Sequence, residues 1–311
     1  MTGRGIDQIL PHPSKPHLFE PYVGLATDYV ELAETASGAV KKPVDFAYVW
    51  GDALEEFERA DPDVRIINLE TAVTGSEDAW PGKGIHYRMN PANTPCLSAA
   101  KLDCCVLANN HVLDWGRSGL FETLDSLHQV KLHTAGAGRN QDEASAPACI
   151  EVRGRGRVLV FAFAMASSGV ARGWAATEKQ SGVNFLRDFS ERAIDAIKRQ
   201  VLSQKQKGDI AVFSVHWDEN WGFSVSKEER MFAHRLIDEA GIDVVHGHSS
   251  HHVKGIEVYR ERPIIYGCGD FLNDYEGIGG HEAYRSDLSL MYFPVVDAAT
   301  GKLLQFSVTP T

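Results

Sequence analysis

The sequence of 311 residues lacks the features of membrane-spanning and nucleic-acid-binding proteins. Its longest apolar run, residues 158–166, is far shorter than the about 20 residues that span a bilayer, and it predicts a buried strand instead. No apolar stretch of the signal-peptide kind follows the first residues. Lys and Arg number 31 against 42 Asp and Glu, so the formal net charge is −11. This acidity disfavours nonspecific binding of nucleic acid or anionic membranes and suits a cation-binding site better.

Cysteine is also scarce, and the five that are present form no C-x-x-C pair. Their number is odd, and two of them are adjacent in an apolar run, so neither a disulfide framework nor a cysteine-based metal site is indicated. We interpret them as reduced core residues and expect a cytoplasmic protein. They are Cys96, Cys104, Cys105, Cys149 and Cys268.

Short apolar runs alternate with amphipathic stretches, which is typical of layered α/β proteins. In residues 189–204, Ile194, Ile197 and Val201 share one helical face. Ser226 followed by Glu229 predicts a capping box for a helix at 227–240. No Gly-, Pro- or Ser-rich linker divides the chain, so we predict one domain over residues 1–311. The predicted strands are 64–69, 104–108, 158–164, 210–215, 244–245 and 263–267, with a terminal hairpin of 288–296 and 303–308; the other predicted helices are 53–60 and 119–128.

Histidine carries the main functional signal, because six of the 13 histidines fall in three places directly after apolar strands. In layered α/β proteins, sites form at the carboxyl ends of strands. Imidazole is the commonest protein ligand for transition metals, and Asn and carboxylate oxygens complete such sites. Four histidines within seven residues of a strand end are hard to explain by packing. The three places are Asn109-Asn110-His111, Val215-His216-Trp217 and the stretch that contains His246, His248, His251 and His252.

Glu70 ends a fourth predicted strand and is therefore expected on the same rim as the histidines. Two metals about 3.5–4 Å apart on this rim could activate a water and clamp a substrate oxyanion. Each residue alone has a simpler explanation. A strand-end histidine can be a hydrogen-bonded structural group, Asn110 and His111 can cap the helix from Gly119, and Glu70 can pair with an arginine. The combination favours a metal site containing Mn, Fe or Zn.

These elements, in this order, resemble the CapA-type branch of the calcineurin-like metallophosphoesterase superfamily, which is linked to the production and export of poly-γ-glutamate capsules. The likeness runs from Gly3 to about Asp274. The matching segments are Asn68-Leu69-Glu70 for the family's Asn-Leu-Glu motif, Asn109-Asn110-His111 with Asp114 and Gly116 for its Asn-Asn-His block, His216-Trp217 for its strand-end histidine, and Gly247-His248-Ser249-Ser250-His251 for its Gly-His-His-Pro-His motif, with two serines in place of His-Pro.

The resemblance implies a four-layer αββα sandwich with a dinuclear metal site on one rim. It implies that His111 is an acid/base or oxyanion-stabilising group, oriented by Asp114. Arg88 stands where the family has an aromatic-Arg pair and would hold a substrate carboxylate or phosphate, unless it is a plain surface arginine. Arg4, in the first motif, would also contact the substrate. The implied metal ligands are Glu70, Asn110, His216, His248 and His251.

The chain departs from the family at its start. Members usually begin with a strand that ends Gly-Asp-Val-Met and continues into Gly-Arg, and residues 1–4 resemble only the tail of that motif. We therefore expect the first strand and its metal-binding aspartate to be missing from this sequence, which weakens one of the two metal positions. Asp270 stands where the family commonly has Asn.

Three functions remain open on these residues. The first is a metal-dependent hydrolase that uses metal-activated water on a phosphoester or on an anionic polymer such as poly-γ-glutamate. The second is a metal-dependent peptide epimerase on the same fold, and the third is a non-catalytic capsule-assembly or binding protein. A mononuclear iron oxygenase built on His216 and Asp218 fits least, because such enzymes usually use an all-β barrel. The expected partners are a small-molecule, peptide or anionic polymer substrate, with no nucleic acid and no membrane span.

Overall fold

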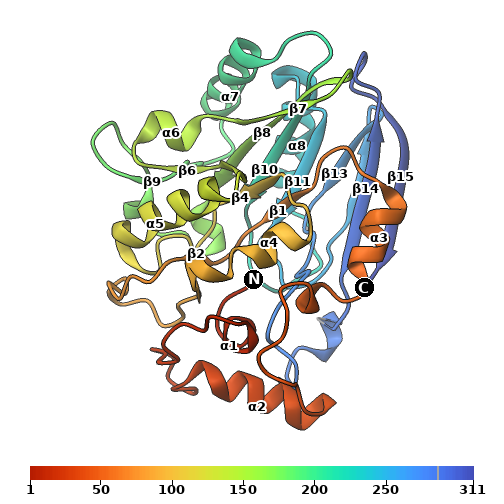
Figure 1. Cartoon of the computed structure of the whole chain (residues 1–311). Coiled ribbons are helices and arrows are strands. Elements are labelled where there is room, and N and C mark those ends of the chain that lie inside the picture. The colour runs from red at the N-terminus through yellow and green to blue at the C-terminus, as the bar shows by residue number, and fades with distance from the viewer. Residues whose placement is uncertain (286) are drawn as a thin grey trace.

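The structure is a computed structural model that describes residues 1–285 and 287–311 (Figure 1). Its two main sheets have the strand orders β1-β4-β5 and β12-β13-β11-β10-β8-β7. Their inner faces share one large apolar core, and helices cover the outer face of each sheet. The predicted four-layer α/β sandwich is therefore confirmed.

The first sheet is short and wholly parallel. It consists of β1 (Ile66–Asn68), β4 (Cys104–Val106) and β5 (His133–Ala135). The helix α5 (Gly116–Gln129) packs on it through a stripe of leucines at i, i+4 and i+7, which are Leu120, Leu124 and Leu127. The shorter α4 (Pro95–Ala99) precedes β4 and buries Cys96 and Leu97 in the same core.

The second sheet combines a parallel centre with antiparallel edges. Its strands are β7 (Ala148–Val152), β8 (Gly156–Ala164), β10 (Ile210–His216), β11 (Val244–His248), β12 (Ile256–Tyr259) and β13 (Arg262–Ile265). Successive side chains face opposite layers: Val212 joins the core between the sheets, whereas Phe213 packs under α7 (Glu191–Gln204) and α8 (Lys227–Ala240). The predicted capping box of α8 is present, because Ser226 and Glu229 exchange backbone-to-side-chain hydrogen bonds of 2.7 and 3.1 Å.

The remaining elements surround this sandwich. The N-terminal α1 and α2 lie at the bottom of Figure 1, and the predicted C-terminal hairpin, β14 with β15, lies beside α3. Residues 1–10 contain α1 and no strand. The bounds are α1 (Gly5–Ile9), α2 (Ala26–Ser37), α3 (Ala53–Ala60), α6 (Gln141–Ser145), β2 (Ala72–Val73), β3 (Arg88–Met89), β6 (Ala137–Gly138), β9 (Gly182–Val183), β14 (Leu290–Val296) and β15 (Leu303–Pro310), with 3₁₀ turns at Tyr48–Trp50, Pro91–Asn93, Ala166–Ser168, Arg172–Trp174 and Glu282–Tyr284.

Two expectations from the sequence are corrected by the fold. The helix α5 begins at Gly116, and no side chain caps its first turn, so capping does not explain Asn110 and His111. The cysteines are free, but they are not all core residues. Cys149 is exposed because it lies on an outward position of the edge strand β7, and Cys268 is only half-buried.

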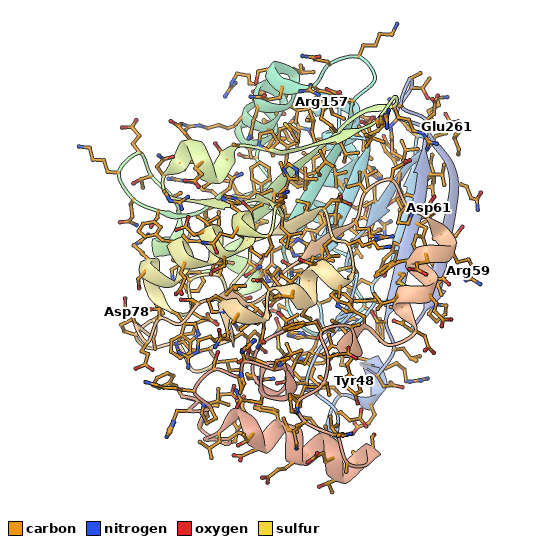
Figure 2. The ribbon with its side chains drawn as sticks, viewed as in Figure 1. Tyr48, Arg59, Asp61, Asp78, Arg157 and Glu261 are labelled. Atoms are coloured by element: carbon orange, nitrogen blue, oxygen red, sulfur yellow. The ribbon has the colours of Figure 1, made fainter. Side chains whose placement is uncertain are left out.

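The parallel strands β8, β10, β11 and β13 place their carboxyl ends at one end of the sandwich. Figure 2 shows Arg157, near the start of β8, and Glu261, just before β13, at the opposite end. The histidines that end β10 and β11 therefore lie at the lower end of the sheet in this view. No helix in residues 1–285 or 287–311 is long and apolar enough to cross a membrane.

Candidate metal and acid–base site

The ends of β10 and β11 bring two of the predicted ligands together. The parallel register pairs His216 with His248, and their Nδ1 atoms are 2.8 Å apart. The Nε2 atom of His216 lies 3.2 Å from Oδ1 of Asn110, which follows β4 of the other sheet. Gly247 has no room for a side chain, because a Cβ there would lie 2.5 Å from the carbonyl oxygen of Tyr266. The close strand packing thus accounts for the glycine between the two strand-end histidines.

Glu70 adds a carboxylate from the end of β1. Its Oε1 atom is 3.8 Å from Nε2 of His216 and 3.9 Å from Nε2 of His111. Its Oε2 atom accepts a 3.0 Å hydrogen bond from Asn68, which in turn accepts one from Asn109. Burial raises the pKa of Glu70 to about 7. The first sheet therefore contributes Glu70 and Asn110, and the second contributes the two histidines.

His251 lies in the loop after β11 and is oriented by Asp270. Its Nδ1 atom is 2.9 Å from the Asp270 carboxylate. Burial alone lowers the pKa of His251, but the charge of Asp270, its hydrogen bond to His251 and the charge of Glu70 together outweigh burial, and the pKa ends above its ordinary value. Burial alone raises the pKa of Asp270, but His251 outweighs it, and that pKa ends below its ordinary value. A histidine held by a carboxylate on one nitrogen is the usual arrangement of a metal ligand, with the other nitrogen available to the ion.

His111 forms a second carboxylate–imidazole pair at the same rim. Its Nδ1 atom is 2.7 Å from Oδ2 of Asp114, which also accepts a 2.6 Å hydrogen bond from the backbone N–H of Tyr87. The ammonium of Lys83 lies 2.5 Å from Oδ1 of Asp114 and 3.1 Å from Nδ1 of His111. Burial lowers the pKa of His111 well below its ordinary value, and the charge of Lys83 lowers it further. The Nε2 atom of this neutral ring faces Glu70.

Behind the ligands, Ser214 links His248 to one further histidine. Its hydroxyl lies 3.0 Å from Nε2 of His248 and 2.9 Å from Nδ1 of His246. Burial lowers the pKa of His246 to about 4, so this ring is neutral and suited to hydrogen bonding. Partners of this kind fix the tautomer and the orientation of a ligating imidazole.

The donor chemistry of this rim fits a divalent transition metal. Burial lowers the pKa values of His216 and His248 well below the ordinary histidine value, which keeps both rings in the neutral form that binds metals. Two imidazole nitrogens that bind one ion through bonds of 2.0–2.1 Å lie roughly 3 Å apart, close to the spacing of these Nδ1 atoms. Across the residues that the structure describes, no three His, Cys, Asp or Glu side chains are close enough to enclose an ion, so metal binding requires the donors to draw together.

Residues 1–275 match the family described as Bacterial capsule synthesis protein PGA_cap. The chain belongs to this family. A relative named Probable polyglutamine synthesis accessory protein, from Mycobacterium tuberculosis, is 48% identical over 311 residues, which are 100% of this chain and 82% of the relative. The PGA biosynthesis protein CapA of Bacillus subtilis is 28% identical over 244 residues, 78% of this chain and 60% of that protein. The Capsule biosynthesis protein CapA of Bacillus anthracis is 27% identical over 192 residues, 62% of this chain and 45% of that protein.

The match to PGA_cap includes every candidate site residue, from Arg4 to Asp270, and confirms the resemblance drawn from the sequence motifs. The C-terminal hairpin of β14 and β15 lies beyond the matched residues. The candidate site is therefore built entirely from the part of the chain that belongs to the PGA_cap family.

The two predicted substrate-binding arginines of this PGA_cap fold both have protein partners. Arg4 is buried and donates to Asp274, Glu20 and Tyr29. Arg88 stacks its guanidinium on Trp115, with 3.9 Å to the ring centre, and donates to the backbone carbonyls of residues 15 and 76. Within the described part of the chain, neither arginine forms a hydrogen bond with a candidate ligand.

Sequence reasoning missed the partners that hold the site residues in place. Lys83 lies in a long loop without periodicity, so no spacing pointed to it. Ser214 occupies an ordinary inward position of β10, and only its place two residues before His216 links it to the site. Asp270 stood out in the sequence as a departure from the family pattern, and its contact with His251 gives that departure a structural role.

Proposed function

We propose that this PGA_cap protein is a metal-dependent hydrolase that cleaves an ester or amide bond of an anionic substrate. The observation that carries the proposal is the grouping of four side chains around the His216 ring, with His248 at its Nδ1 atom and Asn110 and Glu70 at its Nε2 atom. The His111–Asp114 pair lies next to this group. Donors suited to a divalent metal thus adjoin a buried imidazole suited to proton transfer. The relatives are named for polyglutamine synthesis, PGA biosynthesis and capsule biosynthesis, so an anionic polymer such as poly-γ-glutamate is the proposed substrate class.

Glu70, Asn110, His216, His248 and His251 are the residues that would hold Mn, Fe or Zn. Bound there, a divalent ion supplies Lewis-acid polarisation of a substrate oxygen and lowers the pKa of water toward neutrality. Ser214 and Asp270 keep His248 and His251 oriented toward the ion, because each engages the imidazole nitrogen on the other side of its ring.

His111 moves the proton in the proposed reaction. Asp114 holds its Nδ1–H, and burial keeps the ring neutral, so Nε2 accepts a proton from the attacking water and returns it to the leaving group. Burial raises the pKa of Asp114 to about 6, and the Lys83 ammonium opposes the rise, which favours the ionised carboxylate. Lys83 and Asp114 together fix the tautomer on which His111 depends.

The test measures bound metal and turnover in the same samples. Purified protein is loaded with Mn²⁺, Fe²⁺ or Zn²⁺, its metal content is determined, and hydrolysis of p-nitrophenyl phosphate and of poly-γ-glutamate is followed. His216→Ala and His248→Ala should lose both metal and activity. His111→Ala should keep its metal and lose about 10²- to 10⁴-fold in rate.

The control is His128→Ala, which changes a histidine in the last turn of α5 outside the site. If the metal-loaded wild type hydrolyses neither substrate, the proposal is contradicted. If a peptide substrate takes up deuterium from heavy water without being cleaved, the proposed reaction becomes epimerisation instead of hydrolysis.

A further inference from the structure

Two tyrosines lie against the candidate site from segments far apart in the chain. The ring of Tyr87 stacks on His111, with 3.9 Å between ring centres and 19° between planes. Tyr275 presents its ring at 74° to His251, with centres 5.5 Å apart. Their hydroxyls are 3.0 Å apart. The pair therefore spans from the proposed proton-transfer residue to one of the proposed metal ligands.

Both rings are held firmly. The backbone N–H of Tyr87 donates to Asp114, and that of Tyr275 donates to the side chain of Asn273. The guanidinium of Arg4 lies over both rings, 4.7 Å from the centre of Tyr87 and 5.6 Å from that of Tyr275. Asp274, next to Tyr275, anchors this guanidinium through two hydrogen bonds of 2.6 and 3.1 Å. Arg4, whose predicted contact with the substrate stays a prediction, supports the tyrosine pair.

The hydroxyl pair leaves one proton without an acceptor. Two phenols have two O–H donors, and a single hydrogen bond between them uses only one. Neither hydroxyl forms another hydrogen bond within residues 1–285 and 287–311. Tyr87 is 4% exposed and Tyr275 is half-buried, so Tyr275 is the more accessible residue of the two. A phenol, with an ordinary pKa of about 10, keeps its proton near neutral pH.

We propose that the Tyr275 hydroxyl donates a hydrogen bond to an oxygen of the substrate that gains negative charge in the reaction, and that Tyr87 orients it. The inference rests on the proposed function, because it names a further group in the same site. The oxygen belongs to the phosphoryl group of an ester or to the carbonyl group of an amide. Such a donor acts where charge develops, and it stays bound to the protein throughout the reaction.

The experiment compares Tyr275→Phe and Tyr87→Phe with the wild type, all loaded with Mn²⁺. Tyr275→Phe should keep its metal content and melting temperature, lose about 10²-fold in kcat on p-nitrophenyl phosphate, and bind inorganic phosphate about tenfold more weakly by calorimetry. Tyr87→Phe keeps the ring that stacks on His111, and its losses of kcat and of phosphate affinity should be smaller than those of Tyr275→Phe. Tyr259→Phe is the matched control, because the Tyr259 hydroxyl donates to Asp238 on α8 and not to the site. Neither kcat nor phosphate affinity should change in this variant.

The outcomes separate this inference from the proposed function. If the wild type hydrolyses the ester and Tyr275→Phe equals it in both kcat and phosphate affinity, the inference is overturned and the hydrolase remains. If the wild type hydrolyses nothing, and Tyr275→Phe binds phosphate more weakly than the wild type does, the hydrolase is overturned, and Tyr275 remains a hydrogen-bond donor to a bound phosphoryl oxygen. A wild type that neither binds phosphate nor hydrolyses the ester overturns both. A larger kcat loss in Tyr87→Phe than in Tyr275→Phe also overturns the assignment of the donor.

Discussion

Arg4 is the residue whose removal should destabilise this protein most clearly. Its guanidinium bonds Asp274 through Nε at 3.1 Å and Nη2 at 2.6 Å, and it bonds Glu20 and Tyr29 through Nη1 at 2.9 Å each. The Arg4, Glu20 and Asp274 side chains are 3%, 0% and 5% exposed. Replacing Arg4 by Met therefore leaves two buried carboxylates without their cation.

Breaking a buried ion pair by removing one partner costs about 3–5 kcal/mol, because the remaining charge is uncompensated. At about 2 °C per kcal/mol for a chain of this size, Arg4→Met should lower the melting temperature by roughly 6–10 °C. The assay is thermal and urea unfolding followed by circular dichroism. Arg59→Met is the control, since Arg59 pairs with Glu56 on the surface, where such pairs contribute about 0–1 kcal/mol.

A second variant tests the reason for the loss. Adding Glu20→Gln to Arg4→Met removes one of the stranded charges, so it should recover part of the lost stability, whereas Glu20→Gln alone should destabilise the wild type. This non-additivity is expected of residues that share one network. An Arg4→Met variant within 1 kcal/mol of the wild type, or a double variant as unstable as the sum of the single ones, would refute the reasoning.

Three smaller perturbations probe other parts of the structure. Ser214→Ala should weaken Mn²⁺ or Zn²⁺ binding by about 10- to 100-fold in a chelator competition, because Ser214 contacts and orients His248. Ser203→Ala should leave metal binding unchanged, because Ser203 lies on the surface of α7 and bonds Gln200. Burial raises the pKa of Asp7. The contribution of Asp7 to folding should therefore be largest below the ordinary Asp pKa of about 4 and should fall as the pH rises through the raised pKa. The difference in unfolding free energy between the wild type and Asp7→Asn should shrink over the same pH range, and a pH-independent difference would count against this. Ser226→Ala removes the N-cap of α8 and should cost about 1 kcal/mol in urea unfolding, and no loss would mean that the capping box is not significant for stability.

Secondary structure was predictable where apolar periodicity and capping agreed. The bounds of α3 and α8 were predicted to the residue, because amphipathic spacing and, for α8, the Ser226–Glu229 box mark them locally. The strand β11 proved longer than predicted, since it continues through His246 to His248, and the pattern of apolar residues ends before the hydrogen bonding does. The two-residue strands β2, β3, β6 and β9 have no pattern of their own and form only through their partners.

The candidate site was predictable only in part, for a similar reason. Strand-end positions pointed to Glu70, His216 and His248, since parallel strands end at one edge of a sheet. Lys83, Tyr87 and the loop residues that hold Arg4 depend on how long connections fold over that edge. Contacts between residues separated by 188 positions, as for Tyr87 and Tyr275, leave no trace in local spacing. The metal-binding role of the site stays a prediction until metal content is measured.

The split of the site between two sheets has a consequence for how the protein unfolds. Glu70 and Asn110 belong to the N-terminal sheet, whereas His216 and His248 belong to a sheet formed about a hundred residues later in the chain. Any ligand that contacts both pairs joins the two halves of the sandwich, and it binds neither half alone with comparable strength. Such a ligand stabilises the joined sheets relative to separated ones by an amount that grows with its concentration, so saturation with it should slow both proteolysis and amide exchange of the core between the sheets.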